Sequence, residues 1–297
     1  MDNQPLTGQI LDGYNIGRLI GGGAMGEVYE ATHATLSESV AIKILRKEFA
    51  SNENFRLRFE REIRLMKSLR HDNIIPIYHH GRAGDHLYFT MKLIQGPTLF
   101  NMMQHQYFSP ISAWEILRPI SEGLAYGHGM GIIHRDVKPS NIFVEYREGK
   151  LHVYLGDYGL GKAPDVDDTL THFGVPIGTP EYMAPEAALG DKPDFRADIY
   201  SLCVVTYEML LGRLPFRIDS NQPKVLAHVN FSPLAPSYFR SDFPRGLEQV
   251  IMRGLEKYKD NRHPSVMYFG NEYYRVLLEL SEEERNTLYS VQAARFG

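Results

Sequence analysis

Three residues that could handle a phosphate, a metal ion and a hydroxyl proton lie close together between Ile132 and Asn141, in the stretch Ile-Ile-His-Arg-Asp-Val-Lys-Pro-Ser-Asn. The carboxylate of Asp136 can accept a proton from a hydroxyl group, the side-chain carbonyl of Asn141 can bind a hard cation, and Lys138 can pair with a phosphate. Apolar residues precede and follow the stretch, so we expect buried segments to hold this polar loop in place from both sides.

The composition is that of an ordinary globular protein. The chain has 297 residues, of which 43% are hydrophobic and 23% charged. This length allows one large domain or two modest lobes, each with its own core. The net charge of −4 argues against nucleic acid as a partner. The single cysteine, Cys203, excludes an internal disulfide and fits a reducing compartment.

The sequence predicts neither a secretory signal nor a membrane span in this chain. Met1 to Gly8 is polar and lacks the apolar core of a signal peptide. The longest apolar run, Ile199 to Leu211, contains Glu208 and is too short to cross a bilayer. We therefore expect a cytoplasmic chain in which this run forms a buried central helix.

A glycine-rich turn joins the first two predicted strands, which cover residues 11–20 and 28–32. Gly21, Gly23 and Gly26 have the spacing G-x-G-x-x-G, in which missing side chains let backbone amides approach phosphate oxygens. The dinucleotide-binding version of this pattern needs a helix next, whereas residues 27–31 favour a strand. A hairpin turn that uses glycine only for its backbone freedom remains an alternative.

Two charges stand in segments that should otherwise be buried. The alternation in residues 39–45 predicts a strand that carries Lys43 among apolar residues. Residues 52–69 predict a helix in which Glu62 lies within the apolar stripe. Because a buried carboxylate is costly without a partner, we expect Lys43 to pair with Glu62. The alternatives are a surface lysine, and a glutamate that reaches water from the edge of the stripe.

The remaining segments change from strands to helices along the chain. Two more strands are predicted before a break at Gln95-Gly96-Pro97, which is a candidate hinge. After it, Ser109 is the predicted cap of a helix, and Ser281 and Glu284 form a predicted capping box. The predicted strands of this part of the chain cover 74–78, 87–93, 141–145 and 151–155, and the helices cover 110–127 and 199–211.

Several motifs occur in one order, and together they resemble the protein kinase family. The central stretch has the form His-Arg-Asp-x-x-x-x-Asn, which follows the glycine-rich turn, Lys43 and Glu62. Asp157-Tyr158-Gly159 matches the Asp-Phe-Gly motif of the family with Tyr for Phe, and residues 178–186 end in Ala-Pro-Glu. The resemblance covers roughly residues 14–274. Its departures are that tyrosine, Lys92 where the family often has an acid, and Cys203 where it usually has Gly.

The resemblance implies an α+β, protein-kinase-like bilobal fold. It consists of a small antiparallel β N-lobe with one helix, and a larger, mainly helical C-lobe. The implied divisions of this single kinase domain are an N-lobe at 1–94, a hinge at 95–97, a C-lobe at 98–280 and a C-terminal helical tail at 281–297.

The resemblance also implies roles for individual residues in phosphoryl transfer from ATP. The implied catalytic residues are Lys43, Glu62, Asp136 and Lys138. The implied ligands of Mg²⁺, or of Mn²⁺ as a substitute, are Asn141 and Asp157. The implied nucleotide-binding residues are Ile20, Gly21, Gly22, Gly23, Ala24, Gly26, Val28, Ala41, Lys43, Met91, Leu93 and Phe143.

Two further implied interactions are structural. Asp198 is expected to hold the backbone of the catalytic loop, and Glu186 is expected to form a buried ion pair with Arg262.

A regulatory site is implied by two cations near the loop at 162–180. Arg135 and Lys162 could bind a phosphate on Thr169 or Thr171 and thereby order this loop. The alternative is that the aspartates at 165, 167 and 168 already supply the anion.

We therefore expect an active protein Ser/Thr kinase, since Lys138 in Lys-Pro-Ser-Asn resembles Ser/Thr rather than tyrosine kinases. The motifs are most similar to the eukaryotic-like kinases of bacteria, with ATP and Ser- or Thr-containing proteins as partners. The resemblance leaves open a homodimer through the N-lobe, and a longer membrane-anchored protein of which this chain is the cytosolic domain. A nucleotide-binding pseudokinase or scaffold and a small-molecule phosphotransferase are the alternative functions.

Overall fold

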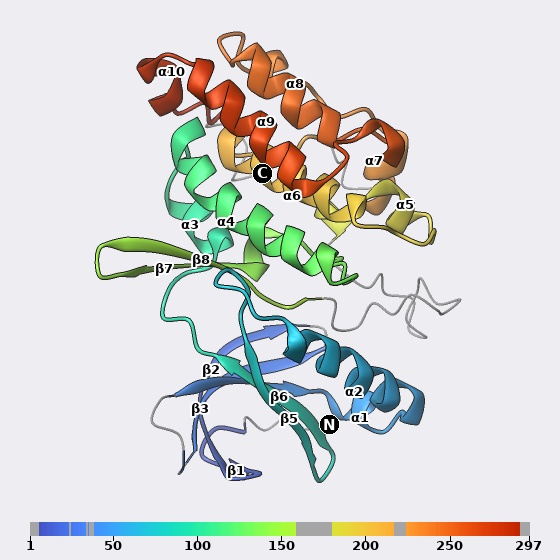
Figure 1. The fold of residues 1–297 in the computed structure, drawn as a ribbon. Coiled ribbons are helices and arrows are strands. Elements are labelled where there is room, and N and C mark those ends of the chain that lie inside the picture. Colours follow the sequence, from blue (N-terminus) through green and yellow to red (C-terminus); the bar gives the residue numbers. More distant parts are fainter. Residues whose placement is uncertain are drawn as a thin grey trace. The chain divides into compact units, whose positions relative to one another are not determined.

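The computed structural model describes residues 6–23, 25–33, 35, 39–158, 180–216 and 224–291. The chain divides into two compact units, Met1–Gln95 and Gly96–Gly297. The first consists mainly of strands and the second mainly of helices (Figure 1). This division agrees with the α+β class that the sequence predicts.

A six-stranded antiparallel sheet forms the first unit, with the strand order β1-β2-β3-β4-β6-β5. In this sheet β4 lies between β3 and β6, and Lys43 pairs in register with Val28 on one side and Phe89 on the other. The strands are β1 Ile10–Leu11, β2 Tyr14–Gly23, β3 Gly26–His33, β4 Val40–Leu45, β5 Ile77–Ala83 and β6 His86–Lys92.

One face of this sheet has its own small core. The strand alternation places Ile42 there, away from Lys43, and it packs with Tyr29 and Tyr88. The turn before β2 and strand β1 cover this cluster with Leu11, and the Tyr88 hydroxyl donates a hydrogen bond to Asp12. The N-terminal hairpin is therefore an integral part of the unit.

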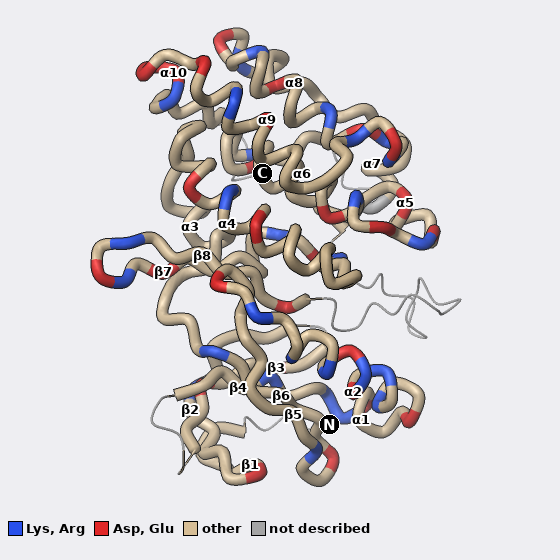
Figure 2. Tube along the Cα trace, in the orientation of Figure 1, with Lys and Arg blue, Asp and Glu red and all other residues tan. Residues whose placement is uncertain are grey.

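Helix α2, Glu53–Ser68, is the long helix of the first unit and follows the short helix α1, Lys47–Ala50. Asn52 caps α2 by accepting a hydrogen bond from the Phe55 amide at 3.0 Å. Its buried stripe is centred on Phe59, Ile63 and Met66, while Lys and Arg residues mark much of its length (Figure 2). Glu62 adjoins this stripe and is half-buried.

Two predicted strands differ from the observed ones. The turn at Asp12-Gly13, where both residues have positive φ angles, separates β1 from β2, whereas the sequence predicts one strand from residue 11. Ile74 and Ile75 are buried but precede β5, which begins only at Ile77. Their apolar character therefore reflects burial in a loop rather than strand pairing.

The second unit is built around helix α6, Arg196–Leu211, in which nearly every residue is buried. Helix α4, Pro110–Gly129, packs against α6 and α9, and Ser109 caps it as predicted. No helix of the described residues is both long and apolar enough to cross a membrane. The other helices are α3 Leu99–His105, α5 Pro185–Ala188, α7 Lys224–Asn230, α8 Arg245–Gly254, α9 Val266–Glu279 and α10 Glu282–Asn286.

A hairpin, β7 Ile142–Arg147 and β8 Lys150–Leu155, follows the central polar loop. Its two-residue turn, Glu148-Gly149, has positive φ angles at both positions, as a tight hairpin turn of the I′ type requires. The hairpin therefore fixes the path of the chain from Asn141 to the Asp-Tyr-Gly motif.

The end of the described chain returns to α6. Ser281 and Glu284 form the predicted capping box of α10. Beyond it, Tyr289 is buried against Phe243, and the Val291 amide donates a hydrogen bond to the Leu211 carbonyl at 3.0 Å.

Cys203 fits into α6 because a glycine faces it. A Cβ atom placed on Gly254 of α8 would lie 2.0 Å from the Cys203 Sγ. Glycine at position 254 thus gives the room that the cysteine occupies, which explains how α6 accommodates a residue larger than the family's usual Gly.

We predict that Gly254→Ala destabilises the fold by about 1–3 kcal/mol through overpacking. The loss should shrink in a Cys203→Ala background, because the sulfur atom is then absent. Urea unfolding of the two single variants and the double variant measures this coupling. Gly129→Ala is the control, because no heavy atom lies within 4 Å of a Cβ there. Equal costs of Gly254→Ala in both backgrounds would contradict the prediction.

Candidate active site

A buried carboxylate anchors the central polar loop. The Asp198 Oδ1 accepts a hydrogen bond from the Arg135 amide at 2.7 Å, and its Oδ2 accepts one from the His134 amide at 2.8 Å. His128 of α4 lies 2.8 Å from the same Oδ2 through its Nε2. Burial disfavours the charged form, but the hydrogen bonds with His128 and with the His134 amide outweigh it and lower the pKa of Asp198. The predicted contact of Asp198 with the loop backbone is therefore present.

His134 connects this loop to the Asp-Tyr-Gly segment. Its Nδ1 accepts a hydrogen bond from the Asp136 amide at 3.2 Å, and its Nε2 donates one to the Gly156 carbonyl at 2.9 Å. One acceptor and one donor nitrogen describe a neutral ring. Burial agrees with this, because it lowers the pKa of His134. The ring thus holds two chain segments 22 residues apart.

Asp136, Lys138 and Asn141 come together as the sequence predicts. The Lys138 Nζ lies 2.8 Å from the Asp136 Oδ2. The Asn141 Nδ2 donates to both the Asp136 carbonyl at 2.9 Å and its Oδ2 at 3.0 Å. The side-chain nitrogen of Asn141 is thereby engaged with Asp136, so the Asn141 Oδ1 is the atom suited to a cation. This arrangement can position a hydroxyl group, accept its proton and pair with a phosphate.

The backbone places Asp157 next to Asn141. The backbone amide of Gly156, the residue before Asp157, donates a hydrogen bond to the backbone carbonyl of Asn141 at 2.9 Å. One carboxylate and one amide oxygen suit Mg²⁺, which usually keeps several waters and shares phosphate ligands. Among the residues described, no group of three or more His, Cys, Asp or Glu could hold a metal ion. The donor set therefore fits a cation that arrives with a nucleotide better than one held by protein alone.

In the first unit, the glycine-rich turn joins β2 and β3, with Gly23 opposite Gly26. A Cβ atom on Gly21, Gly22 or Gly23 would meet nothing closer than 3.9 Å, whereas one on Gly26 would lie 2.2 Å from the Ile44 carbonyl oxygen. Gly26 is thus required for packing against β4, and the other three leave their backbone accessible. Both the phosphate-binding and the hairpin interpretations remain compatible with this geometry.

The other candidate nucleotide-binding residues lie on adjoining strands. Ala41 pairs with Met91, and Lys43 pairs with Val28. Ile20 is exposed on β2, and Leu93 follows β6. In the second unit, Phe143 lies on β7 and pairs with Thr98.

The Lys43–Glu62 ion pair stays a prediction. Lys43 projects from β4 with its Nζ 6.0 Å from the Phe89 ring centroid, and that ring contacts Phe59 of α2. Glu62 lies one turn beyond Phe59 on the same helix. Both charges are therefore near the interface of β4, β6 and α2.

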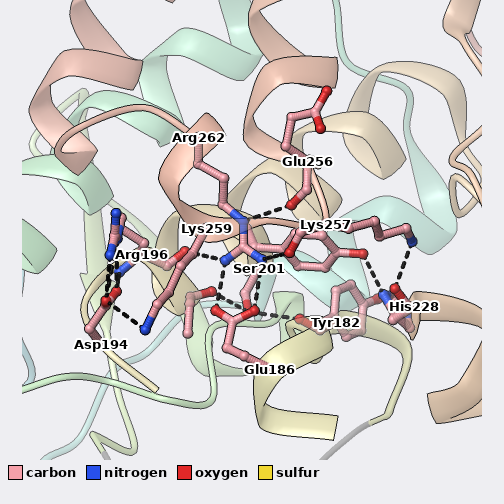
Figure 3. Close-up of polar contacts among 12 residues, drawn as sticks. Tyr182, Glu186, Asp194, Arg196, Ser201, His228, Glu256, Lys257, Lys259 and Arg262 are labelled. Carbon is pink, nitrogen blue, oxygen red and sulfur yellow. Dashed lines mark hydrogen bonds and ion pairs between the residues drawn. The ribbon is translucent and has the colours of Figure 1, made fainter. Parts of the chain in front are cut away.

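The predicted ion pair between Glu186 and Arg262 is present and buried (Figure 3). Two parallel hydrogen bonds of 2.7 Å join the guanidinium to the carboxylate. The remaining donors of Arg262 bond to backbone carbonyls, at 2.8 Å for Glu256, 3.0 Å for Arg196 and 3.1 Å for Lys257. All five N–H groups are satisfied, which is what a buried arginine requires.

Polar contacts extend from this pair to the first turns of α6 and to His228 of α7 (Figure 3). At its start, burial opposes ionisation of Asp194, but hydrogen bonds from Arg196 outweigh it and lower its pKa to about 2. On the other side, the Lys257 Nζ donates to the His228 carbonyl at 2.6 Å, and burial lowers the pKa of Lys257 to about 8. Ser201 donates to the Tyr182 carbonyl at 2.7 Å. The Ala-Pro-Glu segment is thus tied to α6 at several points.

Some predicted residues lie outside the described residues, namely Ala24, Lys162, Thr169 and Thr171. Arg135 is described, and its backbone has a φ angle of 66°. The phosphate-binding role of Arg135 and Lys162 stays a prediction.

Sequence reasoning missed two contacts of the loop. His128 was not singled out, although it lies six residues before His134 and on the helix that leads into the loop. The partner of the Tyr158 hydroxyl was also unknown; it is the Gly123 carbonyl in α4, at 3.0 Å. A helix glycine at 123 or 127 carries no sign of such a contact, whereas the histidine could have been noticed by its type.

The family model of the Protein kinase domain matches residues 14–288. The Ser/Thr-protein kinase PknH of Mycobacterium bovis is 35% identical over 87% of this chain and 43% of its own length. The kinase Pkn1 of Myxococcus xanthus is 33% identical over 93% of this chain and 40% of its own. The chain thus spans about two fifths of the length of these curated relatives.

Solved structures agree with the sequence comparison. The Mycobacterium tuberculosis PknI kinase domain, as a C20A_R136A double mutant, has a TM-score of 0.74 and 26% identity, and the match covers 93% of this chain and 99% of that one. The fold class is therefore confirmed. The chain belongs to the protein kinase domain family.

We predict that Asp198→Asn destabilises the second unit by about 1–3 kcal/mol, because an amide turns an amino group toward one of the two backbone N–H donors. Urea unfolding measures the loss, and amide hydrogen exchange should rise at residues 134–136. Asp260→Asn is the control; it breaks an exposed pair with Arg196 and should cost less than about 1 kcal/mol. Equal effects of the two substitutions would contradict the anchoring role.

We also predict that the free energy of unfolding decreases as the pH drops below about 6.5, because of His228. Burial keeps this side chain neutral in the folded chain by lowering its pKa to about 4. Below pH 6.5 the unfolded chain binds a proton there and the folded chain does not, so unfolding is favoured. Linkage gives up to about 2 kcal/mol between pH 7.5 and 5. The loss over this interval should shrink in His228→Gln and persist in His105→Gln, a change at an exposed residue. An unchanged pH dependence in His228→Gln would disprove it.

Proposed function

We propose that this chain is a protein Ser/Thr kinase domain that transfers the γ-phosphate of ATP to Ser or Thr hydroxyls of proteins. The observation that carries this proposal is the joint contact of Asp136 with Lys138 and Asn141, in a loop held by the buried Asp198. Relatives named as Ser/Thr-protein kinases, at about 35% identity, support it.

Asp136 orients the substrate hydroxyl and accepts its proton as the oxygen attacks the γ-phosphorus and ADP leaves. Its carboxylate is already fixed by the Asn141 amide, so little reorganisation is needed on binding. Lys138, 2.8 Å from that carboxylate, is placed to pair with the phosphoryl oxygens during transfer.

Asn141 and Asp157 would hold Mg²⁺, which neutralises charge on the nucleotide phosphates when bound; Mn²⁺ would substitute for it. In the first unit, Lys43 grips the α- and β-phosphates with Glu62 as its partner. The open backbone at residues 21–23 binds phosphate oxygens, while Met91 and Leu93 contact the adenine. In the second unit, Phe143 is the proposed nucleotide-binding residue.

Regulation follows from the same positions. Phosphorylation of Thr169 or Thr171 supplies an anion for Arg135 and Lys162, and so orders the segment between Asp157 and the Ala-Pro-Glu motif. The chain acts in the cytosol on protein substrates, as an N-lobe homodimer or as a monomer. Phosphosite mapping after incubation with ATP tests the loop, since full activity without loop phosphate would refute this regulation.

We predict that Asp136→Asn lowers phosphoryl transfer at least about 100-fold, because the amide cannot accept the hydroxyl proton. The measurement uses purified protein, Mg²⁺ and γ-labelled ATP, with label followed on the chain and on a generic Ser/Thr protein substrate. Asp191→Asn, at an exposed position, is the matched control and should keep full activity.

Four outcomes are informative. Label that disappears only in Asp136→Asn supports the kinase. ATP binding without label in the native chain would favour a scaffold, and label transferred only to small molecules would favour a phosphotransferase of that class. Absence of ATP binding would contradict the whole nucleotide site.

A further inference from the structure

The tyrosine of the Asp-Tyr-Gly motif makes a contact that phenylalanine cannot make. Its side chain is 4% exposed, and its hydroxyl donates a hydrogen bond to the Gly123 carbonyl of α4 at 3.0 Å. The Tyr158 ring also packs on the His134 ring, with centroids 4.5 Å apart. The residue after Asp157 is therefore fixed to both α4 and the polar loop.

Residues of α4 form the space that the Tyr158 hydroxyl occupies. A Cβ atom on Gly127 would lie 2.8 Å from the Tyr158 hydroxyl oxygen, so this glycine leaves the space that the hydroxyl fills. Gly123 and Gly127 lie one turn apart on the same face of the helix. Two helix glycines thus accommodate one hydroxyl group: the Gly123 carbonyl accepts its hydrogen bond, and Gly127 leaves the space that it occupies.

Asp157 itself has an unfavourable backbone conformation. Its φ angle is 54°, in the left-handed region that residues with a side chain rarely adopt. Such a conformation persists only where the surroundings determine it. On the N-terminal side, Gly156 is held through its amide by Asn141 and through its carbonyl by His134. On the C-terminal side, Tyr158 makes the holding contact.

We propose that the Tyr158 hydroxyl is a latch that positions Asp157 for metal binding. With the hydroxyl bonded to Gly123, the chain is pinned on both sides of Asp157, and the carboxylate is kept in the conformation seen here. Tyr158 is a positioning residue, since it acts through its neighbour. This inference rests on the proposed metal-binding role of Asp157.

The size of the effect follows from one buried hydrogen bond. Its net contribution corresponds to a factor of about 2–10 in an equilibrium between a held and a released Asp157. If only the held form binds the metal, loss of the hydroxyl weakens the apparent metal affinity by up to that factor, and the full factor applies where the released form is the major one. The ring contact with His134 would remain.

The test is Tyr158→Phe, which restores the residue usual in the family and should fold. Tyr273→Phe is the matched control, because it removes a buried hydroxyl that donates to the Pro110 carbonyl at the start of the same helix, at 2.9 Å. Three quantities are measured for each: stability in urea, Mn²⁺ affinity by electron paramagnetic resonance with a non-hydrolysable ATP analogue, and hydrogen exchange at residues 153–158.

Both variants should lose similar stability. Only Tyr158→Phe should weaken Mn²⁺ binding, by up to about 10-fold, speed exchange at residues 156–158 and raise the metal concentration needed for half-maximal labelling. Gly127→Ala, which crowds the hydroxyl oxygen, should weaken Mn²⁺ binding in the same way.

Equal Mn²⁺ affinity and exchange in the native chain, Tyr158→Phe and Tyr273→Phe would overturn the latch and leave the proposed kinase function intact. If the native chain bound no Mn²⁺ with the ATP analogue, the latch and the proposed function would both fail.

Discussion

The Asp198 carboxylate is the charge on which the rest of the second unit depends. A carboxylate with no exposed surface can stay ionised only if donors surround it, and here two of those donors are backbone amides of the polar loop. The loop therefore has its shape because α6 buries a charge beneath it. Through His134, the same constraint reaches Gly156 and hence Asp157. One buried group thus sets the relative positions of Asp136, Asn141 and Asp157.

A second buried ion pair, between Glu186 and Arg262, packs against α6. The Arg262 guanidinium packs over Tyr200 of α6 with 4.9 Å between its carbon and the ring centroid, while it pairs with Glu186. A buried pair of this kind contributes little net stability, but either partner alone would be costly. Its effect is therefore geometric, since it fixes the Ala-Pro-Glu segment against the helix that carries Asp198. The two charge systems give α6 one role, as the common support of both segments.

The sequence predicted local and paired features well. Capping by Ser109 and by Ser281 with Glu284 follows from neighbouring residues, and the contacts of Asp198 and of Glu186 with Arg262 follow from recognised motifs. The long-range contact of Tyr158 with Gly123, which belongs to no motif, was not predictable, because nothing local marks its partner. Ile74 and Ile75 resembled a strand, since burial in a loop and burial in a sheet select the same apolar residues.

The small core beneath β1 and β2 shows that the folded unit starts earlier in the chain than the family match. The family match begins at residue 14, but Leu6 and Leu11 already pack on the cluster of Tyr29, Ile42 and Tyr88. A chain shortened to the matched region would leave this aromatic and aliphatic surface in water, where such patches promote association between molecules. The folding unit therefore begins before the shared family region, and Leu6 and Leu11 cover apolar surface that would otherwise promote association between molecules.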